Sequence, residues 1–230
     1  MRLDQFVSQA LLISRSDAKR LIKSGCIQLD GKPCKDSARQ LDQQHVHCDD
    51  QPLALPGHRY LMLNKPAGYV CSHQDDGYPS ALQLLPAECS RLLFAGRLDA
   101  DSTGLVLLSS DGQWCHRITS PKQRQQKSKR YRLQLAEPAS ADALDRLQQG
   151  ILLHGESRPT LPCRIEAIDA THCHITLQEG RYHQVKRMFA AIGNRVITLH
   201  REQIGALQLD EADLPPGHYR ALSADEVALF

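Results

Sequence analysis

Apolar side chains recur every three or four residues at the start of the chain, which is the spacing of one helix face. The residues that share this face are Leu3, Phe6, Val7 and Ala10. A second helix is expected over Arg15–Lys23, because Ser14, with Asp17 three residues later, resembles a capping pair and Gly25 can end a helix. The pattern therefore opens with two short amphipathic helices.

The pattern changes after the second helix and divides the chain near residue 50. Residues 26–29 have the character of a strand, and Asp30-Gly31 is typical of a hairpin turn. Pro52, Pro56 and Gly57 then lie among polar residues. We expect a small domain over residues 1–50, a linker over 51–59 and a larger domain over 60–230.

The larger domain alternates irregularly between strand-like and helix-like patterns. Its strand-like segments are residues 60–63, 105–109, 130–135, 173–177 and 196–199. Its helix-like segments are residues 114–119, 140–149 and 182–192. Because no strand–helix–strand repeat runs through them, the pattern favours an α+β fold over a doubly wound one.

The composition is that of a folded globular chain, with 41% hydrophobic and 23% charged residues in 230. No apolar run approaches the roughly 20 residues that a membrane span requires, and no apolar leader follows Met1. A cytoplasmic protein is expected.

Eight cysteines are present, but none forms a CxxC pair, so we expect reduced thiols rather than disulfides. Two His/Cys groups, residues 45–48 and 172–174, raise the possibility of zinc. Both lie in strand-like segments without the ligand spacing of a structural zinc site, and we expect no metal.

Charge is unevenly distributed, although the formal net charge is only +2. Residues 112–136 contain no acid, whereas the last 21 residues contain five acids and one arginine. The cations of the basic run are Arg117, Lys122, Arg124, Lys127, Lys129, Arg130 and Arg132. Like charges repel unless an anion neutralises them, and phosphate is the natural candidate.

A second basic feature is a ridge on the predicted second helix, where Arg15, Lys19 and Lys23 recur every fourth residue and stack on one face. The simpler explanation of this ridge is a helix face exposed to water. The more specific explanation is that its cations contact phosphates. The segment RLDQFVSQALLISRSDAKRLIKSGCIQLDG resembles an S4 domain, a small RNA-binding module. This resemblance implies that the ridge, together with Arg2, faces structured RNA.

The stretch GRLDADSTGL crowds Arg97, Asp99 and Asp101 into five residues. One explanation is a magnesium loop, because Asp99 to Thr103 fits the DxDxT spacing of haloacid-dehalogenase-type phosphotransferases. A second is a turn, capped by Asp101 or Ser102, in which Gly104 supplies a positive φ. A third uses Arg97 to keep Asp99 ionised as a nucleophile.

The third explanation agrees with a family resemblance. GRLDADSTGLVLLSSDG resembles the GRLDxxTxGLxLLTxDG signature of pseudouridine synthases, and the preceding S4 domain resembles the RsuA-type branch. Three further segments resemble motifs of that branch: Asn64-Lys65-Pro66 with Gly68, Lys129-Arg130-Tyr131, and residues 179–188, EGRYHQVKRM. The resemblance implies a catalytic domain with a mixed, largely antiparallel sheet and flanking helices.

It also implies residue roles. Asp99 is the catalytic carboxylate, Tyr131 stacks on the target base, Lys186 pairs with Asp99, and Arg97 helps to hold the nucleotide out of its stack. Whether Lys186 or Arg187 points inward stays open. RNA contacts are expected from Lys127, Lys129, Arg130, Arg181 and Arg187. His183 has no distinguishing context, and a supporting role is expected.

The sequence therefore predicts a monomeric isomerase, free of cofactor and metal, that converts a uridine of ribosomal RNA to pseudouridine. Small-subunit 16S RNA is favoured over large-subunit RNA by the branch that the chain resembles. A non-catalytic RNA-binding or ribosome-assembly protein is the rival from another class. Arg97 and Asp99 argue against this alternative, because an RNA-binding protein gains nothing from a carboxylate directed at phosphates.

Overall fold

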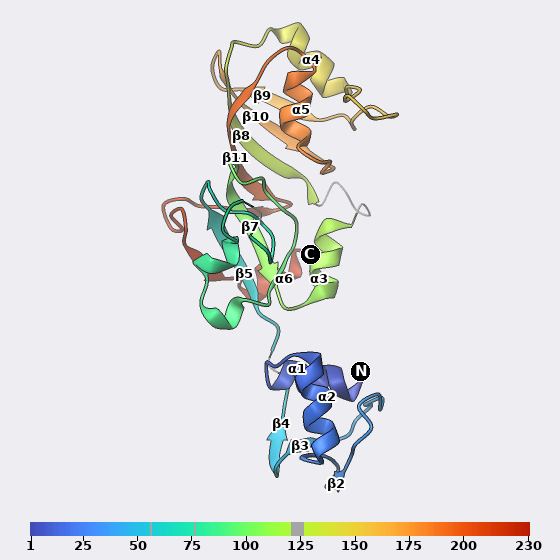
Figure 1. Cartoon of the computed structure of the whole chain (residues 1–230). Helices are drawn as coiled ribbons and strands as arrows, with labels where there is room; N and C mark the ends of the chain where they lie inside the picture. The colour runs from blue at the N-terminus through green and yellow to red at the C-terminus, as the bar shows by residue number, and fades with distance from the viewer. Residues whose placement is uncertain (56, 76, 121–126) are drawn as a thin grey trace. The chain divides into compact units, whose positions relative to one another are not determined.

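The computed structural model describes residues 1–55, 57–75, 77–120 and 127–230. The chain forms two compact units, Met1–His58 and Arg59–Phe230. Figure 1 shows the first in blue and the second from cyan to red. In the part of the chain that is described, no helix has both the length and the apolar character needed to cross a membrane.

The first unit packs two helices on a small sheet. Helix α1 covers Leu3–Ala10 and α2 covers Arg15–Ser24. The sheet has the order β2-β1-β3-β4, with β1 Ile27–Leu29, β2 Lys32–Pro33, β3 Val46–Cys48 and β4 Gln51–Leu53. The predicted signals act as expected: Ser14 accepts a hydrogen bond from the amide of Asp17, and Gly25 ends α2 at φ 94°.

The expected linker was wrong in its first three residues. Gln51–Leu53 form β4, which pairs antiparallel with β3, with Pro52 opposite His47. Proline has no backbone N–H to donate, but β4 is the edge strand, so one of its sides needs no donor. Pro56 lies outside the described residues.

The second unit is built on a mixed, largely antiparallel sheet, as predicted. Its main path is β13-β5-β7-β11-β8-β10-β9, in which only the β7–β11 pairing is parallel among the described strands. The strands are β5 Tyr60–Lys65, β7 Thr103–Ser109, β8 Lys129–Leu135, β9 Arg164–Ala167, β10 His172–Leu177, β11 Val196–Ile204 and β13 Tyr219–Ala221. Two short strands, β6 Leu93–Phe94 and β12 Leu207–Gln208, pair with β7 and β11.

Helices cover this sheet in two groups (Figure 1). Helix α4, Ala141–Gln149, and α5, Gln184–Ala190, lie together over the β8–β10 half, while α3, Gly112–Thr119, lies beside β7. Helix α6, Ala224–Ala228, and two 3₁₀ turns, η1 Ala81–Leu84 and η2 Ala87–Cys89, complete the unit. Helix α5 is shorter than predicted at both ends but buries the predicted face through Val185, Met188 and Phe189.

All eight cysteines are free thiols. The two His/Cys groups lie in and beside β3 and β10, where neighbouring side chains alternate between faces of a sheet. Across the described ranges, no three His, Cys, Asp or Glu side chains gather closely enough to hold a metal ion.

Candidate active site

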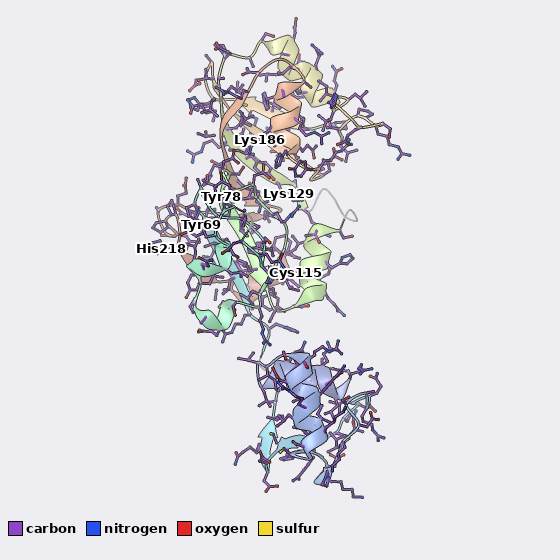
Figure 2. All side chains as sticks on the ribbon, in the orientation of Figure 1. Tyr69, Tyr78, Cys115, Lys129, Lys186 and His218 are labelled. Carbon is purple, nitrogen blue, oxygen red and sulfur yellow. The ribbon has the colours of Figure 1, made fainter. Side chains whose placement is uncertain are left out.

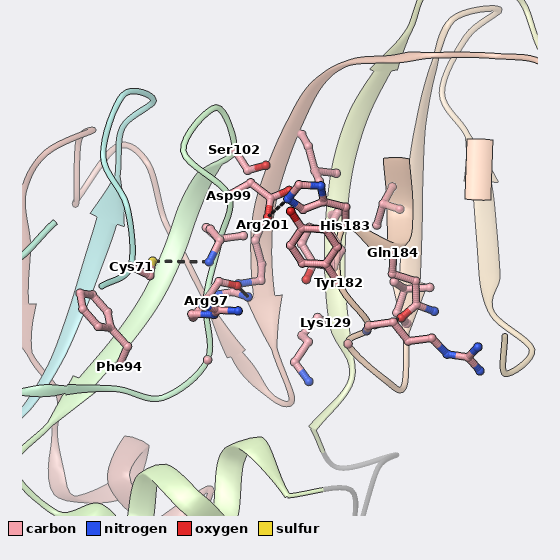
Figure 3. A pocket seen from close by; sticks show the side chains of 18 of the residues that line it. Cys71, Phe94, Arg97, Asp99, Ser102, Lys129, Tyr182, His183, Gln184 and Arg201 are labelled. Atoms are coloured by element: carbon pink, nitrogen blue, oxygen red, sulfur yellow. Dashed lines mark hydrogen bonds and ion pairs between the residues drawn. The ribbon is translucent and has the colours of Figure 1, made fainter. Parts of the chain in front are cut away.

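A cavity of about 690 Å³ opens in the second unit. Its walls are the loop before β7, the inner face of β8 and the segment that leads into α5. The four residues predicted for catalysis, Arg97, Asp99, Tyr131 and Lys186, all line it. Figure 2 labels Lys186 on the whole chain, and Figure 3 labels Arg97 and Asp99 at the cavity together with Lys129, Tyr182 and His183 from other segments.

The loop that carries Asp99 is a tight turn, as the structural explanation of GRLDADSTGL predicted. The amide of Ser102 donates to the carbonyl of Asp99 at 3.1 Å, and Ser102 is fully buried. Gly104, the second residue of β7, has φ 101°, and a Cβ there would collide with the backbone of Arg201 on β11. The turn thus needs glycine at position 104 for both conformation and space.

Lys65 stabilises this loop through hydrogen bonds to backbone carbonyls. Its buried ammonium donates to the carbonyls of Pro66 and Tyr69 at 2.9 and 2.8 Å, and to that of Ala100 at 3.4 Å. The amide of Gly68 also donates to Ala100 at 2.8 Å. Burial lowers the pKa of Lys65. The Asn-Lys-Pro turn that the sequence singled out therefore holds the backbone next to Asp99.

Asp99 is held between two basic side chains from the start of α5. Nζ of Lys186 lies 3.1 Å from its Oδ2, and Nε2 of His183 lies 3.3 Å from its Oδ1 (Figure 3). Lys186 also donates to Oδ1 of Asp101 at 2.6 Å. Burial opposes the charge of Lys186, but the hydrogen bonds to Asp101 and Asp99 outweigh it and raise the pKa of Lys186. Asp101, against the effect of its own partial burial, has its pKa lowered by Lys186.

The expected partner Arg97 does not make this contact. Arg97 is exposed at the cavity wall, and among the described residues no ion pair joins it to Asp99. Its carbonyl instead accepts a hydrogen bond from Arg201 at 3.2 Å. The cation beside Asp99 comes from α5, because the side chain two residues before Asp99 leaves the tight turn in another direction.

The structure resolves which member of the Lys-Arg pair faces Asp99. Arg187 turns away and binds Glu156 at 2.8 Å and the carbonyl of His154 at 2.8 Å. Arg181 binds the same Glu156 at 2.7 Å and the carbonyl of Pro159 at 2.6 Å. Both arginines were predicted to contact RNA; the structure places them in a clamp on residues 154–159.

Strand β8 separates the predicted cations by face. Lys129 and Tyr131 point into the cavity, and Tyr131 is only 8% exposed because it also packs in the core. Arg130 lies on the opposite face and binds Glu166 at 3.0 Å. Burial first, then the charges of Arg201 and Lys127, lowers the pKa of Lys129 to about 8.

The rest of the basic run is divided in the same way. Lys127 is 6% exposed, and Arg132 binds Glu202 at 3.1 Å on the face of Arg130. Lys122 and Arg124 lie outside the described residues. Lys129 is thus the predicted cation that the structure places in the cavity beside Tyr131.

Two site residues were missed by sequence reasoning. His183, at the start of α5, has φ 48°, a conformation that costs a non-glycine residue about 1–2 kcal/mol. Arg201 is 2% exposed, donates to the carbonyl of Leu105 at 2.7 Å, and keeps one guanidinium nitrogen without a hydrogen-bond partner among the described residues. The available signal for Arg201 was a cation at an inward position of a strand, because cations are rarely buried unpaired.

The magnesium-loop explanation does not fit this arrangement. Asp99 and Asp101 precede β7 instead of following a parallel strand, and they share the ammonium of Lys186. A cation already occupies the position where a metal ion would have to bind.

The predicted ridge of the first unit is organised around a buried acid. Asp4 has a side chain 1% exposed and binds Arg2 and Arg15 at 3.0 Å each, with Lys19 at 3.9 Å. Hydrogen bonding to Arg2 is the main reason that the pKa of Asp4 falls well below its usual value. Lys23 is exposed on the same helix. One carboxylate therefore holds three cations, whose outer ends face solvent.

Comparison with known proteins matches both units. Residues 59–191 match the family model of RNA pseudouridylate synthase, and residues 1–47 match that of the S4 domain. The ribosomal small subunit pseudouridine synthases A of Vibrio cholerae and Escherichia coli K12 are each 48% identical to this chain, covering 99% of it and 98% and 99% of their own lengths. A crystal structure of a pseudouridylate synthase superposes with a TM-score of 0.73 at 43% identity, covering both chains completely.

Proposed function

The chain belongs to the RNA pseudouridylate synthase family, and from this premise we propose that it isomerises a uridine of small-subunit ribosomal RNA to pseudouridine, with Asp99 as the catalytic carboxylate. The observation that carries the proposal is the position of Asp99, 3.1 Å from Lys186 in a cavity that Tyr131 also lines. Relatives named for the small subunit cover essentially the whole chain, which favours this substrate over large-subunit RNA.

Uridine and pseudouridine contain the same atoms, so the reaction needs no net oxidant, reductant or group donor. The bond between C1′ and N1 breaks, the uracil turns, and a bond between C1′ and C5 forms. The proton on C5 leaves and one is gained at N1, which balances the exchange. The reaction therefore requires a group to assist at the sugar, a surface to hold the free base and a base for the C5 proton.

Asp99 serves the first requirement. Its carboxylate either attacks C1′ or removes the proton at C2′, and the ion pair with Lys186 orients it. Either route needs the nucleotide to leave its stack, because neither sugar position is accessible to a protein carboxylate inside folded RNA.

Tyr131, a residue only 8% exposed on the inner face of β8, serves the second requirement and is also the group proposed to accept the C5 proton. A base that enters the cavity regains on this ring part of the stacking that it loses in the RNA. Lys129, two residues earlier on the same face, supplies a cation for a flanking phosphate. Arg97 stands at the wall where the nucleotide enters.

The ridge of Arg2, Arg15, Lys19 and Lys23 is proposed to bind the RNA backbone outside the cavity. Every group assigned to the reaction comes from one chain, which supports a monomer as the working form. A ribosomal RNA substrate implies a cytoplasmic location.

The decisive experiment maps pseudouridines in small-subunit RNA from cells with and without this protein, and then restores the modification with purified protein. Asp99→Asn should lower the rate by about 10³-fold or more while RNA affinity stays within a few-fold. Asp142→Asn, at an exposed position in the first turn of α4, is the charge-matched control. Full activity of Asp99→Asn would refute the assignment, and modification confined to large-subunit RNA would refute the substrate.

A further inference from the structure

The rim of the cavity carries an aromatic pair that the proposed chemistry leaves unused. Tyr182 is 71% exposed, the largest exposed fraction among the large apolar side chains that the structure describes. Its ring lies on that of His183 with 3.8 Å between centroids and 19° between planes. Figure 3 shows the two rings together beside Asp99. A tyrosine so placed exposes apolar surface to water without contributing to the core.

Both residues of the pair are held in place by contacts with neighbouring residues. His183 contacts Asp99 at 3.3 Å through Nε2, and the carbonyl of Tyr182 accepts a hydrogen bond from Arg187 at 3.1 Å. Arg187 is itself fixed by Glu156. The pair is therefore tied to the catalytic carboxylate on one side and to the clamp on the other. A ligand that stacks on it has little further ordering to do.

Depth in the cavity separates the roles of the two tyrosines. Tyr131 is 8% exposed, so a base that reaches it must leave the RNA completely. Tyr182 lines the same cavity as Asp99 but is open to solvent over most of its surface. A ring at that position is closer to the nucleotides that flank an extruded nucleotide in the RNA strand than to the extruded nucleotide itself.

We propose that the Tyr182–His183 pair is a stacking platform for the base of the nucleotide next to the target uridine. Extruding one nucleotide removes a stacking partner from each of its neighbours, and an aromatic face restores one of them. Stacking accepts every base, so the platform contributes affinity and positioning more than sequence preference. The inference rests on the proposed function for the identity of the target but concerns a different nucleotide.

The test uses a synthetic RNA hairpin that contains the mapped uridine, prepared in four forms. One is intact, and the others carry an abasic ribose at the target, at its 5′ neighbour or at its 3′ neighbour. Tyr182→Ala should weaken binding of the intact hairpin by about 5- to 100-fold. On the hairpin that lacks the stacked neighbour, the same substitution should cost less than about twofold, because the platform has nothing left to bind.

Matched variants separate stacking from other effects. Tyr182→Phe keeps the ring and should bind like the wild type, whereas Tyr219→Ala removes a tyrosine from β13, at the far end of the sheet, and should change nothing. An unchanged affinity of Tyr182→Ala would overturn the proposal. So would an equal loss on all four hairpins, or a loss that vanishes only when the target base is missing. Conversion of uridine to pseudouridine in the intact hairpin by the wild-type protein tests the proposed function separately. The affinity measurements can be interpreted whether or not this conversion occurs.

Discussion

Lys186 reaches from the start of α5 to within 3.1 Å of Asp99 in the turn before β7. The two residues belong to segments far apart in the sequence, and both β7 and α5 contact β11. The same ammonium contacts Asp101 at 2.6 Å. Removing it would therefore leave two carboxylates facing each other without a counter-charge.

Lys186→Met should lower the rate of pseudouridine formation by about 10²- to 10⁴-fold, because Asp99 loses the cation that orients its carboxylate. Lys186→Arg, which restores the charge with a different shape, should recover part of the loss. Single-turnover rates on the substrate RNA would measure both. A Lys186→Met enzyme within threefold of the wild type would contradict the role.

Asp101→Asn should be mild, with less than about tenfold loss of rate. The side chain of Asp101 is 73% exposed, so water replaces much of what it provides, and Lys186 stays bound to Asp99. A loss of rate as large as that of Asp99→Asn would mean that the catalytic role has been assigned to the wrong carboxylate.

RNA affinity should depend on pH through Lys129. The pKa of Lys129 is lowered to about 8, so its positive charge is present below that pH and is lost as the pH rises through it. If the ammonium binds a phosphate, affinity should fall between pH 7 and pH 9, by about tenfold at most for one titrating group. Fluorescence anisotropy with the substrate RNA would follow the change.

Lys129→Arg is the matched variant, because arginine stays charged throughout this range. Its affinity should be nearly flat with pH. Three cysteine thiols, Cys115, Cys163 and Cys173, have pKa values raised to about 11 or 12 by burial and do not titrate there. The same pH dependence in wild type and Lys129→Arg would exclude Lys129 as its source.

Asp4→Asn should weaken RNA binding although it makes the chain more basic. The buried carboxylate holds Arg2, Arg15 and Lys19 in one geometry, and without it their side chains must be ordered by the RNA. We expect a roughly 2- to 10-fold loss of affinity and a stability loss of about 1–3 kcal/mol. Asp42→Asn, at an exposed position, adds the same charge and should bind equally or slightly more tightly. Tighter binding by Asp4→Asn would show that charge alone decides.

Gly104→Ala should destabilise the second unit by about 3 kcal/mol or more, because it combines a strained φ of 101° with a collision against the backbone of Arg201. Gly155→Ala isolates the first effect: its φ is 77° and nothing lies within 4 Å of the added carbon. Its cost should be about 1 kcal/mol. Equal losses in thermal unfolding would show that the close approach of β7 and β11 contributes nothing.

Local signals in the sequence predicted local structure well. Ser14 and Gly25 bound α2 as expected, and the strand predicted over residues 130–135 forms most of β8. The positive φ predicted for Gly104 was also correct. Each of these features depends on neighbours within a few residues, which a sequence displays directly.

Features that depend on distant segments were not predictable in the same way. Arg97 is close to Asp99 in sequence, yet the cation that contacts Asp99 is Lys186 of α5. Arg130 neighbours Lys129 but faces Glu166 across the sheet. His183 and Arg201 gained their importance only when strands far apart in the chain were paired. Proximity along the chain was a poor guide wherever a strand or a tight turn reverses the direction of successive side chains.

The clamp that Arg181 and Arg187 form on Glu156 affects which residues of the protein can be substituted during evolution. It fastens residues 154–159 through backbone carbonyls and one acid, so the exposed side chains of that loop are free to vary. New contacts with a differently shaped RNA can arise there while the reacting carboxylate keeps its surroundings. Substitutions in this loop can therefore alter which RNA is bound without altering the residues around Asp99, even though Lys186 and Arg187 are adjacent in the sequence.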